Sequence, residues 1–539
     1  MNTSQDYDFI VVGGGSAGCV LANRLSADPA NRVLLIEAGA RDNSIFIRMP
    51  AGFSRVFGTH RMWGYESEPQ AGLRGRKAYV PQGRTLGGSG SMNGMIYIRG
   101  DRKDYDDWRD QGCAGWGYDD VLPWFRKSEG NVRLSDAFHG AEGPLKVIDT
   151  PYRHTLNSAF VRSAQELGLP FNHDFNGDSQ LGAGFYQITA FQGERGNTAR
   201  FFLRPAMDRA NLDVRTDLTV ARVLFQGARA NGVECIESKG AHTKASFRAR
   251  REVVLCAGGL GSAKILLQSG VGPGAQLQSL GIPVVRDLAG VGRNYQDHLE
   301  VPVYGQTRSP ISLFGQDKGL SALKHGAQWV LFKTGLMTSN VVESGGFFDV
   351  DGDGRADVQF HVLPVLVGDV DREPPMVHGV TLNPCLLAPK SRGELRLRSP
   401  DPLALPWLDA GALAEEDDVR VLREGVRLAR RILGAPSLAA LVSHEIEPLA
   451  EFAGDGDATI DARVRHYAKT VYHPGGTCKM GCDSQAVVDA RLRVHGLQGL
   501  RVADVSVMPT IPRGNTNAGT IMIAERAADF IHSEKIHHA

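Results

Sequence analysis

A glycine-rich turn near the start of the chain constrains the fold more than any other feature. The apolar run 7–12 has the character of a buried strand, and it leads into a turn in which Gly13, Gly15 and Gly18 form the pattern G-x-G-x-x-G. A helix-forming segment and a second apolar run follow, and that run ends at Glu37. Missing side chains let the backbone approach a pyrophosphate at a helix N-terminus, and a carboxylate after the second strand can accept ribose hydroxyls. The order predicts a strand-helix-strand unit that binds a dinucleotide, with NAD and FAD both compatible.

Charge and hydropathy limit the partners. The 60 basic and 60 acidic side chains cancel, so no global field draws the chain to nucleic acid. No apolar run is long enough to cross a bilayer, and the first residues do not resemble a secretory signal. The 7 cysteines are typical of free thiols in a reducing compartment. We expect a cytoplasmic protein, with peripheral contact at the inner face of a membrane left open and the oligomeric state undetermined.

Two further regions indicate how the rest of the chain is organised. Residues 214–255 carry β-rich runs such as VARVLF and REVVLCAGG, which predict further strands of the first sheet. Residues 301–466 mix strands such as ADVQFHVLPV with VRVLREGVRLARRIL, whose apolar positions recur at helical spacing. This second region is expected to form a separate domain.

A resemblance to a known family appears at residues 83–100, GRTLGGSGSMNGMIYIRG. This segment is similar throughout to the first signature of the glucose-methanol-choline (GMC) oxidoreductases. Residues 258–272 resemble the second signature, with Gly259 and Ala263 departing from it, and GVGRNYQDHLE and VYHPGGTCKMG extend the similarity. The likeness spans almost the whole chain, which looks like a choline dehydrogenase-like or FAD-dependent alcohol dehydrogenase.

The resemblance implies an α/β fold with two domains. A Rossmann-like FAD-binding domain would be assembled from the discontinuous segments 1–155, 196–300 and 467–539. An α+β substrate domain would comprise 156–195 and 301–466, and its antiparallel sheet would cover the flavin.

The resemblance also extends the cofactor site beyond the glycine-rich turn and Glu37. By motif position the further FAD contacts would be Ser16, Ala17, Ala38, Arg84, Gly87, Gly88, Asn93, Gly94, Val220, Ala257, Ala503, Asp504, Asn515 and Thr516. Some relatives attach FAD covalently through a histidine in the glycine-rich segment, but Met92 stands at that position here. We therefore expect FAD that is bound non-covalently.

Alcohol oxidation needs a base for the hydroxyl proton and an acceptor for the hydride. Histidine suits the first role, and flavin N5 suits the second. By resemblance, His473 would be the base and Asn517 would lie beside it, holding the alcohol oxygen. Taken alone, each would more often be a structural side chain in a turn, but the surrounding signatures favour catalysis. The helix expected after Asn517 would direct its N-terminus at the flavin. His298 is expected to be structural.

The substrate region carries weaker signals. Choline-oxidising relatives have a glutamate in a setting like that of Glu300, where it can face a quaternary ammonium, but a role at a domain boundary fits equally well. Tyr472 adjoins the proposed base and is a second candidate contact. Cys478 and Cys482 lack the further ligands of a zinc site, and residues 349–357 lack the closing glutamate of an EF-hand, so no metal is expected.

These observations lead to one expected function and several alternatives. We expect FAD-dependent oxidation of a primary alcohol to the aldehyde by hydride transfer to flavin N5, with electrons passed to a quinone or another carrier. An oxidase that uses O2 and releases H2O2 is the nearest alternative. A lyase or photodecarboxylase that keeps the fold, and a flavoprotein without catalysis, belong to other classes.

Overall fold

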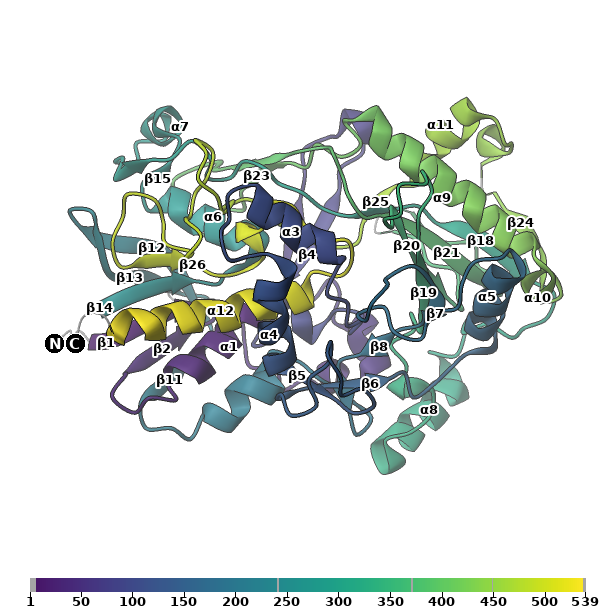
Figure 1. Cartoon of the computed structure of the whole chain (residues 1–539), viewed down its shortest axis with the longest axis horizontal. Helices are drawn as coiled ribbons and strands as arrows, with labels where there is room; N and C mark the ends of the chain where they lie inside the picture. The colour runs from purple at the N-terminus through teal and green to yellow at the C-terminus, as the bar shows by residue number, and fades with distance from the viewer. Residues whose placement is uncertain (1–5, 240–241, 370–371, 448, 537–539) are drawn as a thin grey trace.

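The computed structural model describes residues 6–239, 242–369, 372–447 and 449–536 and contains two large sheets, on the left and right of Figure 1. In spatial order, the first sheet comprises β11 (Leu212–Arg215), β2 (Val33–Ile36), β1 (Asp6–Val12), β14 (Lys244–Leu255), β13 (Arg229–Glu237) and β12 (Leu218–Gln226), with β26 (Leu500–Val502) paired to β14.

The centre of the first sheet is parallel and fully buried. Strand β1 pairs in parallel with β2 and β14, and Ile10 lies between Leu34 and Val253. All four residues of β2 are buried, as expected for a strand covered on both faces. The first half of β14 pairs with β13 and its last residues pair with β26, so the C-terminal segment of the chain returns to the sheet that the N-terminus begins.

Helices α1 (Ser16–Leu25) and α12 (Asn517–Ile536) lie against each other beside this sheet, and α4 (Tyr118–Ser128) packs on α12 (Figure 1). A buried ion pair joins the first two helices, because Arg24 contacts the fully buried carboxylate of Glu525 at 2.6 Å. Lys127 of α4 lies 3.4 Å from the same carboxylate, so Glu525 joins all three helices and helps to fix how they pack.

The second sheet is antiparallel along its main path. Its strands are β24 (Val442–Ile446), β18 (Val303–Thr307), β21 (Gly379–Leu386), β20 (Val358–Leu363), β19 (Ser344–Phe348) and β7 (Gly182–Phe185). Off this path, β17 (Leu299–Glu300) pairs with β21, and β25 (Lys469–Thr470) pairs with β17. Helices α5 (Thr155–Glu166) and α9 (Glu416–Gly434) pack on it. The amphipathic helix predicted around 419–433 is therefore confirmed.

Side chains alternate across β20, which explains how one strand serves both the core and a cavity. Phe360 stacks on Phe160 of α5, with ring centroids 6.0 Å apart. His361 and Leu363 line a cavity on the opposite face. Successive strand residues point to opposite faces, so α5 and α9 cover one face of the sheet and leave the other to the cavity.

The α/β class, the antiparallel second sheet and the joining of 214–255 to the first sheet agree with the sequence analysis. Strands β17 and β25 pair within the second sheet, although their residues fall in segments assigned to the FAD-binding domain. The domain boundaries themselves stay a prediction.

Shorter elements connect the two sheets. The remaining helices, with η for 3-10 or π turns, are α2 (Ile45–Arg48), η1 (Pro50–Arg55), η2 (Ala71–Leu73), η3 (Gly88–Ser91), α3 (Arg102–Asp110), η4 (Ala199–Leu203), η5 (Arg204–Ala206), α7 (Gly274–Ser279), α6 (Gly258–Gln268), α8 (Gly319–Phe332), η6 (Leu336–Thr338), α10 (Pro436–Ala439), η7 (Ala450–Phe452), α11 (Asp457–Tyr467) and η8 (Val505–Val507). The remaining strands are β3 (Met62–Glu66), β4 (Tyr79–Gly83), β5 (Glu129–Asn131), β6 (Leu145–Asp149), β8 (Gln187–Ile188), β9 (Ala190–Phe191), β10 (Glu194–Arg195), β15 (Val271–Gly272), β16 (Arg286–Asp287), β22 (Glu394–Arg396) and β23 (Trp407–Asp409).

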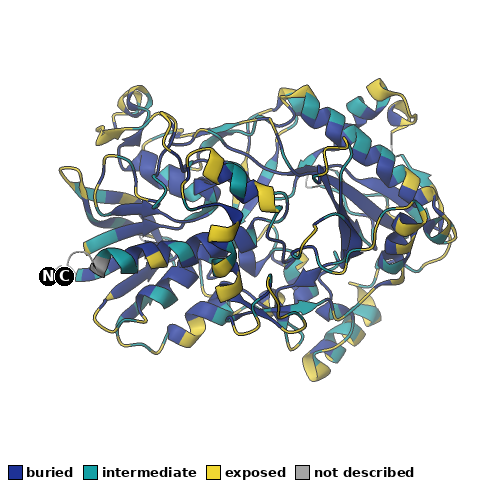
Figure 2. Cartoon of the chain, viewed as in Figure 1, coloured by how far each residue is buried: buried dark blue, intermediate teal, exposed yellow. Residues whose placement is uncertain are grey.

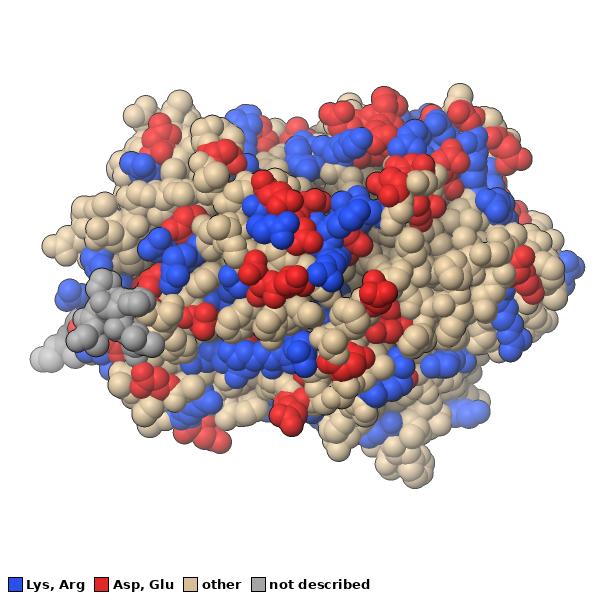
Figure 3. Space-filling model, in the orientation of Figure 1, with Lys and Arg blue, Asp and Glu red and all other residues tan. Residues whose placement is uncertain are grey.

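Burial and charge follow the layers. The strands of both sheets are largely buried, and exposed residues gather on outer helices and loops (Figure 2). Basic and acidic side chains are interspersed over the face shown in Figure 3. Among the described residues, none of the helices has the length and apolar character needed to cross a membrane.

Candidate active site

A cavity lies between the ends of the first sheet and the free face of the second. Its wall includes the glycine-rich turn after β1, the segment around Met92, and residues of β20 and β21. It also includes the two C-terminal segments around His473 and Asn515. Residues from distant parts of the chain therefore converge on one space.

Each glycine of the fingerprint has a different structural role. Gly13 has φ +99°, and a Cβ there would lie 2.5 Å from the carbonyl oxygen of Cys256. A Cβ on Gly18 would lie 1.8 Å from the carbonyl oxygen of Gly13, so this glycine allows α1 to pack against the turn. At Gly15, in contrast, the nearest atoms to a Cβ would be 3.8 and 4.0 Å away. The open space at Gly15 faces the cavity, and α1 begins there without a side-chain cap. This is the arrangement that accepts a pyrophosphate.

Glu37 lies at the end of β2 and holds the same turn. Its two carboxylate oxygens accept hydrogen bonds from the backbone N–H groups of Gly14 and Gly39, each at 2.8 Å. Burial raises its pKa to about 7, although the two N–H donors and Arg84 oppose that rise. The carboxylate lines the cavity and retains lone pairs that can accept further donors.

The other predicted cofactor residues divide into two groups. Those that line the cavity with the turn are Ser16, Ala17, Ala38, Gly88, Asn93, Gly94, Val220, Ala257, Asp504, Asn515 and Thr516. Gly18, Arg84, Gly87 and Ala503 do not line it. Arg84 lies over the ring of Trp63 at 4.5 Å, and the N–H of Ala503 pairs with the carbonyl of Leu255 in the first sheet.

Asp504 lines the cavity and holds two segments of its wall together. Its carboxylate accepts hydrogen bonds from Ser262 Oγ at 2.6 Å and from the N–H of Gly258 at 2.9 Å, at the start of α6. It also accepts hydrogen bonds from the N–H and hydroxyl of Ser506. Burial raises its pKa against these donors. The side chain therefore ties the start of α6 to the segment after β26.

The asparagine beside His473 is Asn515, which corrects the expected pairing with Asn517. Asn515 Nδ2 lies 3.4 Å from His473 Nε2, and its Oδ1 accepts a hydrogen bond from Gln359 Nε2 at 3.2 Å. The side chain of Asn517 instead accepts a hydrogen bond from Ser16 Oγ at 2.6 Å. The chain turns between the two residues, so they serve different neighbours. Helix α12 begins at Asn517, as expected.

His298 also differs from its expected structural role, because it contacts the proposed base directly. Its Nδ1 lies 3.0 Å from Nδ1 of His473, and its Nε2 lies 3.1 Å from the carbonyl oxygen of Leu387. A carbonyl only accepts, so Nε2 of His298 carries a proton. Burial lowers the pKa of His298 to about 3, which keeps the ring neutral and leaves Nδ1 as an acceptor. His473 must therefore donate from Nδ1 and present an unprotonated Nε2 to the cavity.

The environment of His473 favours its neutral form. Burial lowers its pKa well below the usual value, and His298 and His361 add to the effect. Its backbone N–H donates to Asp297 Oδ1 at 2.8 Å, which fixes the loop. Tyr472, immediately before it, has a left-handed φ of +68° and lines the cavity.

Glu300 lies on the cavity wall with both carboxylate oxygens already engaged. Oε2 accepts from His361 Nδ1 at 3.0 Å, and Oε1 accepts from Asn383 Nδ2 at 2.9 Å. The ammonium of Lys469 lies 3.5 Å from Oε1. Burial raises the pKa of Glu300, but the His361 hydrogen bond and the charge of Lys469 outweigh it, so the pKa is lowered. The carboxylate is ionised and its charge is compensated by the protein itself.

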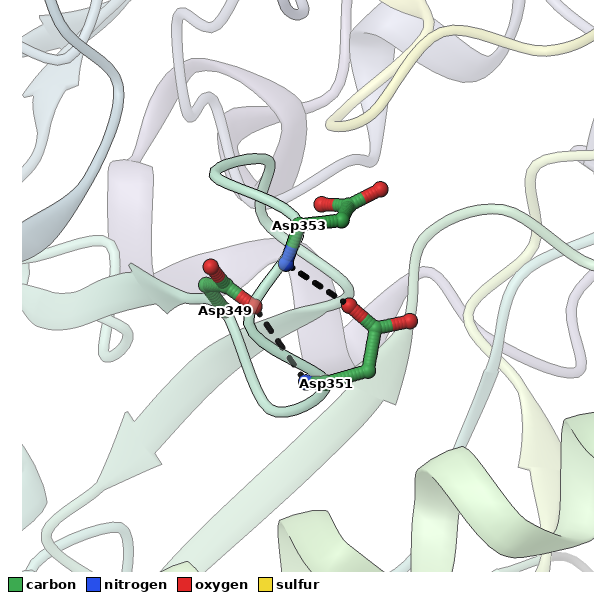
Figure 4. Close-up of side chains that lie close together, drawn as sticks. All are labelled: Asp349, Asp351 and Asp353. Carbon is green, nitrogen blue, oxygen red and sulfur yellow. Dashed lines mark hydrogen bonds between the residues drawn. The ribbon is translucent and has the colours of Figure 1, made fainter.

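The aspartates of the 349–357 loop form a close group. Ligand oxygens of Asp349, Asp351 and Asp353 lie within 4.8 Å of one another. Figure 4 shows hydrogen bonds from the backbone of Asp351 to Asp349 and from that of Asp353 to Asp351. The N–H groups of Gly352 and Gly354 also donate to Asp349. These bonds are those of a self-capped polar turn in the loop between β19 and β20.

Comparison with known proteins agrees with this geometry. The GMC oxidoreductase family matches residues 7–300 with its N-terminal model and 389–524 with its C-terminal model. The chain belongs to the GMC oxidoreductase family. It is 42% identical to an alcohol dehydrogenase [acceptor] of Pseudomonas putida (97% of this chain, 95% of the relative) and 42% identical to an oxygen-dependent choline dehydrogenase of Burkholderia multivorans (99% and 94%). Pyridoxine 4-oxidase from Mesorbium loti shares the fold with a TM-score of 0.89 and 30% identity, over 98% of this chain and 99% of that one.

This GMC oxidoreductase uses FAD, and its residues fit that cofactor. The open space at Gly15, the uncapped start of α1 and the carboxylate of Glu37 provide a pyrophosphate and ribose site. Met92 lines the cavity, and its thioether has no nucleophilic nitrogen of the kind that makes the covalent histidine link.

Several residues of the GMC site were missed in the sequence. Gln359, His361, Asn383 and Lys469 all come from strands of the second sheet. A signal for two of them was present, because Gln359 and His361 interrupt the apolar strand 358–363 with a period of two. For Lys469 and Asn383 no comparable pattern exists.

The fingerprint glycines generate a first prediction. Gly18→Ala should lower the free energy of unfolding by at least about 2 kcal/mol, because its Cβ would collide with the backbone of Gly13. Gly15→Ala should leave the stability of the cofactor-free protein within about 0.5 kcal/mol of wild type. It should nevertheless weaken FAD binding at least about tenfold, because the new methyl fills the pyrophosphate space. Denaturant unfolding and FAD titration measure the two effects. Equal FAD affinity in Gly15→Ala would place the pyrophosphate elsewhere.

Proposed function

We propose that this GMC oxidoreductase oxidises an uncharged primary alcohol to the aldehyde and passes the electrons to a quinone or another carrier. The observation that carries the proposal is the pairing of His473 Nε2 with the amide of Asn515 at the cavity wall, 3.4 Å apart. The alcohol dehydrogenase [acceptor] of Pseudomonas putida, 42% identical, supports the same reaction class.

The two side chains offer complementary groups to an alcohol. His473 Nε2 is unprotonated, because the ring carries its proton on Nδ1 and donates it in a hydrogen bond to His298, and the Nε2 lone pair faces the amide of Asn515. Asn515 turns its N–H groups toward the same space, because its oxygen is held by Gln359. A hydroxyl between them donates its proton to His473 and accepts from Asn515, which stabilises the developing alkoxide.

The protein residues take the proton, and the hydride needs a separate acceptor. Bound FAD supplies the acceptor for the hydride that leaves the carbinol carbon, as the C=O double bond of the aldehyde forms. His473 would hold the hydroxyl proton at Nε2 and keep its own proton at Nδ1, which it donates in a hydrogen bond to the neutral ring of His298. The positive charge therefore stays on His473 until solvent removes the proton.

The electron acceptor separates the leading proposal from its nearest alternative. An oxidase would release about one H2O2 per aldehyde in air, whereas a dehydrogenase would reduce an artificial quinone much faster than it consumes O2. We expect quinone reduction to dominate, and stoichiometric H2O2 would favour the oxidase. Lyase, photodecarboxylase and non-catalytic alternatives predict no alcohol-dependent loss of flavin absorbance in anaerobic mixing.

The charges near Glu300 support an uncharged substrate over a quaternary ammonium. Both oxygens of Glu300 accept hydrogen bonds, and Lys469 supplies the counter-charge at 3.5 Å. A cationic head group would meet an ammonium before it met an unpaired carboxylate, and like charges in a buried site repel strongly. Choline-type substrates are therefore disfavoured, although choline dehydrogenases are among the relatives.

The catalytic pair is tested by three matched alanine variants. His473→Ala should slow alcohol-dependent flavin reduction by about 10²- to 10⁴-fold, and Asn515→Ala by about 10²-fold, with FAD retained in both. Asn517→Ala is the control and should change the rate by less than about tenfold, because its oxygen is bound to Ser16. Anaerobic stopped-flow absorbance measures the rates. A loss in Asn517→Ala as large as that in Asn515→Ala would contradict the assignment.

The substrate charge is tested with a pair of isosteric alcohols. Wild-type enzyme should have a lower KM for 3,3-dimethyl-1-butanol than for choline, because the two differ mainly in charge. Lys469→Met should lower the KM for choline at least about fivefold and leave that for the neutral alcohol nearly unchanged, since Glu300 then lacks its counter-charge. A wild-type preference for choline, or equal changes for both alcohols, would reject the uncharged substrate class.

A further inference from the structure

Helix α8 exposes a row of large apolar side chains. Within Gly319–Phe332 only Trp329 is buried, and its indole N–H donates to the carbonyl of Gly193 at 2.7 Å. The exposed apolar residues and their exposed fractions are Leu320 (84%), Leu323 (70%), Val330 (54%), Leu331 (70%) and Phe332 (69%). Figure 1 shows α8 projecting from the body of the molecule. Contiguous apolar exposure of this size marks an interaction surface.

The apolar surface continues onto a neighbouring helix. Ile45 and Phe46 of α2 are also exposed, and Arg48 at the end of α2 contacts Glu194 at 2.5 Å. Lys333, immediately after α8, contacts the same carboxylate at 3.2 Å. Glu194 therefore brings α2 and the end of α8 together. We call the exposed apolar residues of these two helices the α8 surface.

The charges around α8 identify what the surface fits. Residues 318–342 contain Lys318, Lys324 and Lys333 and no aspartate or glutamate. The last acidic residue before them, Asp317, is paired with Arg55 at 3.6 Å. Glu194, which Lys333 contacts, is shared with Arg48 and Arg200, so basic side chains outnumber acidic ones around the helix. A helix with exposed leucines and phenylalanine in such basic surroundings has the composition of a segment that lies in the interface of an anionic bilayer.

A second copy of the chain fits the same surface less well. Symmetric pairing would set the lysines of one α8 near those of the other, with no acidic residue in 318–342 to neutralise them. Lipid phosphates supply that neutralisation, and acyl chains cover the leucines. We propose that the α8 surface docks this protein on the headgroup region of an anionic membrane.

Docking there would bring the cavity close to the lipid. Arg55 of η1 donates to the backbone carbonyl of Asp317 just before α8, at 3.3 Å, and η1 also packs on η6 just after it. Phe53 of η1 lines the cavity. Given the proposed function, a quinone or an apolar alcohol dissolved in the membrane would then lie near the cavity wall; this consequence rests on that function, whereas membrane docking does not.

Vesicle flotation of the full-length, FAD-loaded enzyme tests the proposal. Vesicles of phosphatidylcholine with one quarter phosphatidylglycerol should carry the protein, and vesicles of phosphatidylcholine alone should carry at least about fivefold less. Leu320→Ser/Leu323→Ser should lower binding to the anionic vesicles at least about tenfold, and so should Lys324→Glu. The matched control is Val132→Ser/Met376→Ser, which removes two side chains of similar exposure outside the α8 surface and should bind as wild type.

Activity with a soluble artificial quinone is measured in parallel and should be equal in all these proteins. This measurement keeps the two proposals separate. Loss of wild-type flotation with full soluble activity would count against membrane docking alone. Absent activity with retained flotation would count against the proposed reaction alone. Failure of wild type to float with anionic vesicles would overturn the docking proposal. So would a wild-type dimer in solution that Leu320→Ser/Leu323→Ser converts to a monomer, since a second copy would then cover the surface.

Discussion

The turn that precedes α12 is the contact on which both halves of the active site depend. Within five residues, Arg513 binds Asp104, Asn515 lies between His473 and Gln359, and Asn517 binds Ser16. Gln359 belongs to the second sheet and Ser16 to the helix after the first strand. One short segment therefore sets the distance between the nucleotide-binding turn and the substrate wall. Hydrogen bonds fix geometry more strictly than apolar contacts do, and a buried amide left without partners is costly.

Neutral hydrogen bonds position the base, which avoids burying a net charge at the cavity wall. A carboxylate beside His473 Nδ1 would raise its pKa and favour the imidazolium, whereas the neutral ring of His298 orients it without that shift. The carbonyl of Leu387 completes the chain by fixing the proton on His298. The carboxylate of Asp297 accepts the backbone N–H of His473, and burial raises its own pKa to about 7. The arrangement keeps Nε2 unprotonated in the resting enzyme.

The sequence predicted those parts of the molecule that depend on local pattern. The fingerprint glycines, Glu37 and the helix at 416–434 follow from short-range periodicity and turn chemistry, and the structure contains them. It did not predict which asparagine meets His473, because a shift of two residues along a turn reverses the direction of a side chain. Asn517 was chosen by motif position, and the hydrogen bond from Ser16 takes it away from the base. His298 was missed because its partner is 175 residues away in sequence.

Different segments carry the groups that transfer the proton and the groups that discriminate between charged and neutral substrates. The turn before α12 and the loop of His473 hold the groups that move a proton. Strands β17, β20, β21 and β25 hold Glu300 and its three partners His361, Asn383 and Lys469. Burying an ion pair such as Glu300–Lys469 costs desolvation that its attraction only partly returns, so stability alone does not explain it. An apolar pair would pack at lower cost but would leave the wall indifferent to charge. The Lys469 ammonium that compensates this carboxylate lines the cavity and repels a cation, whereas a neutral chain meets no opposing charge.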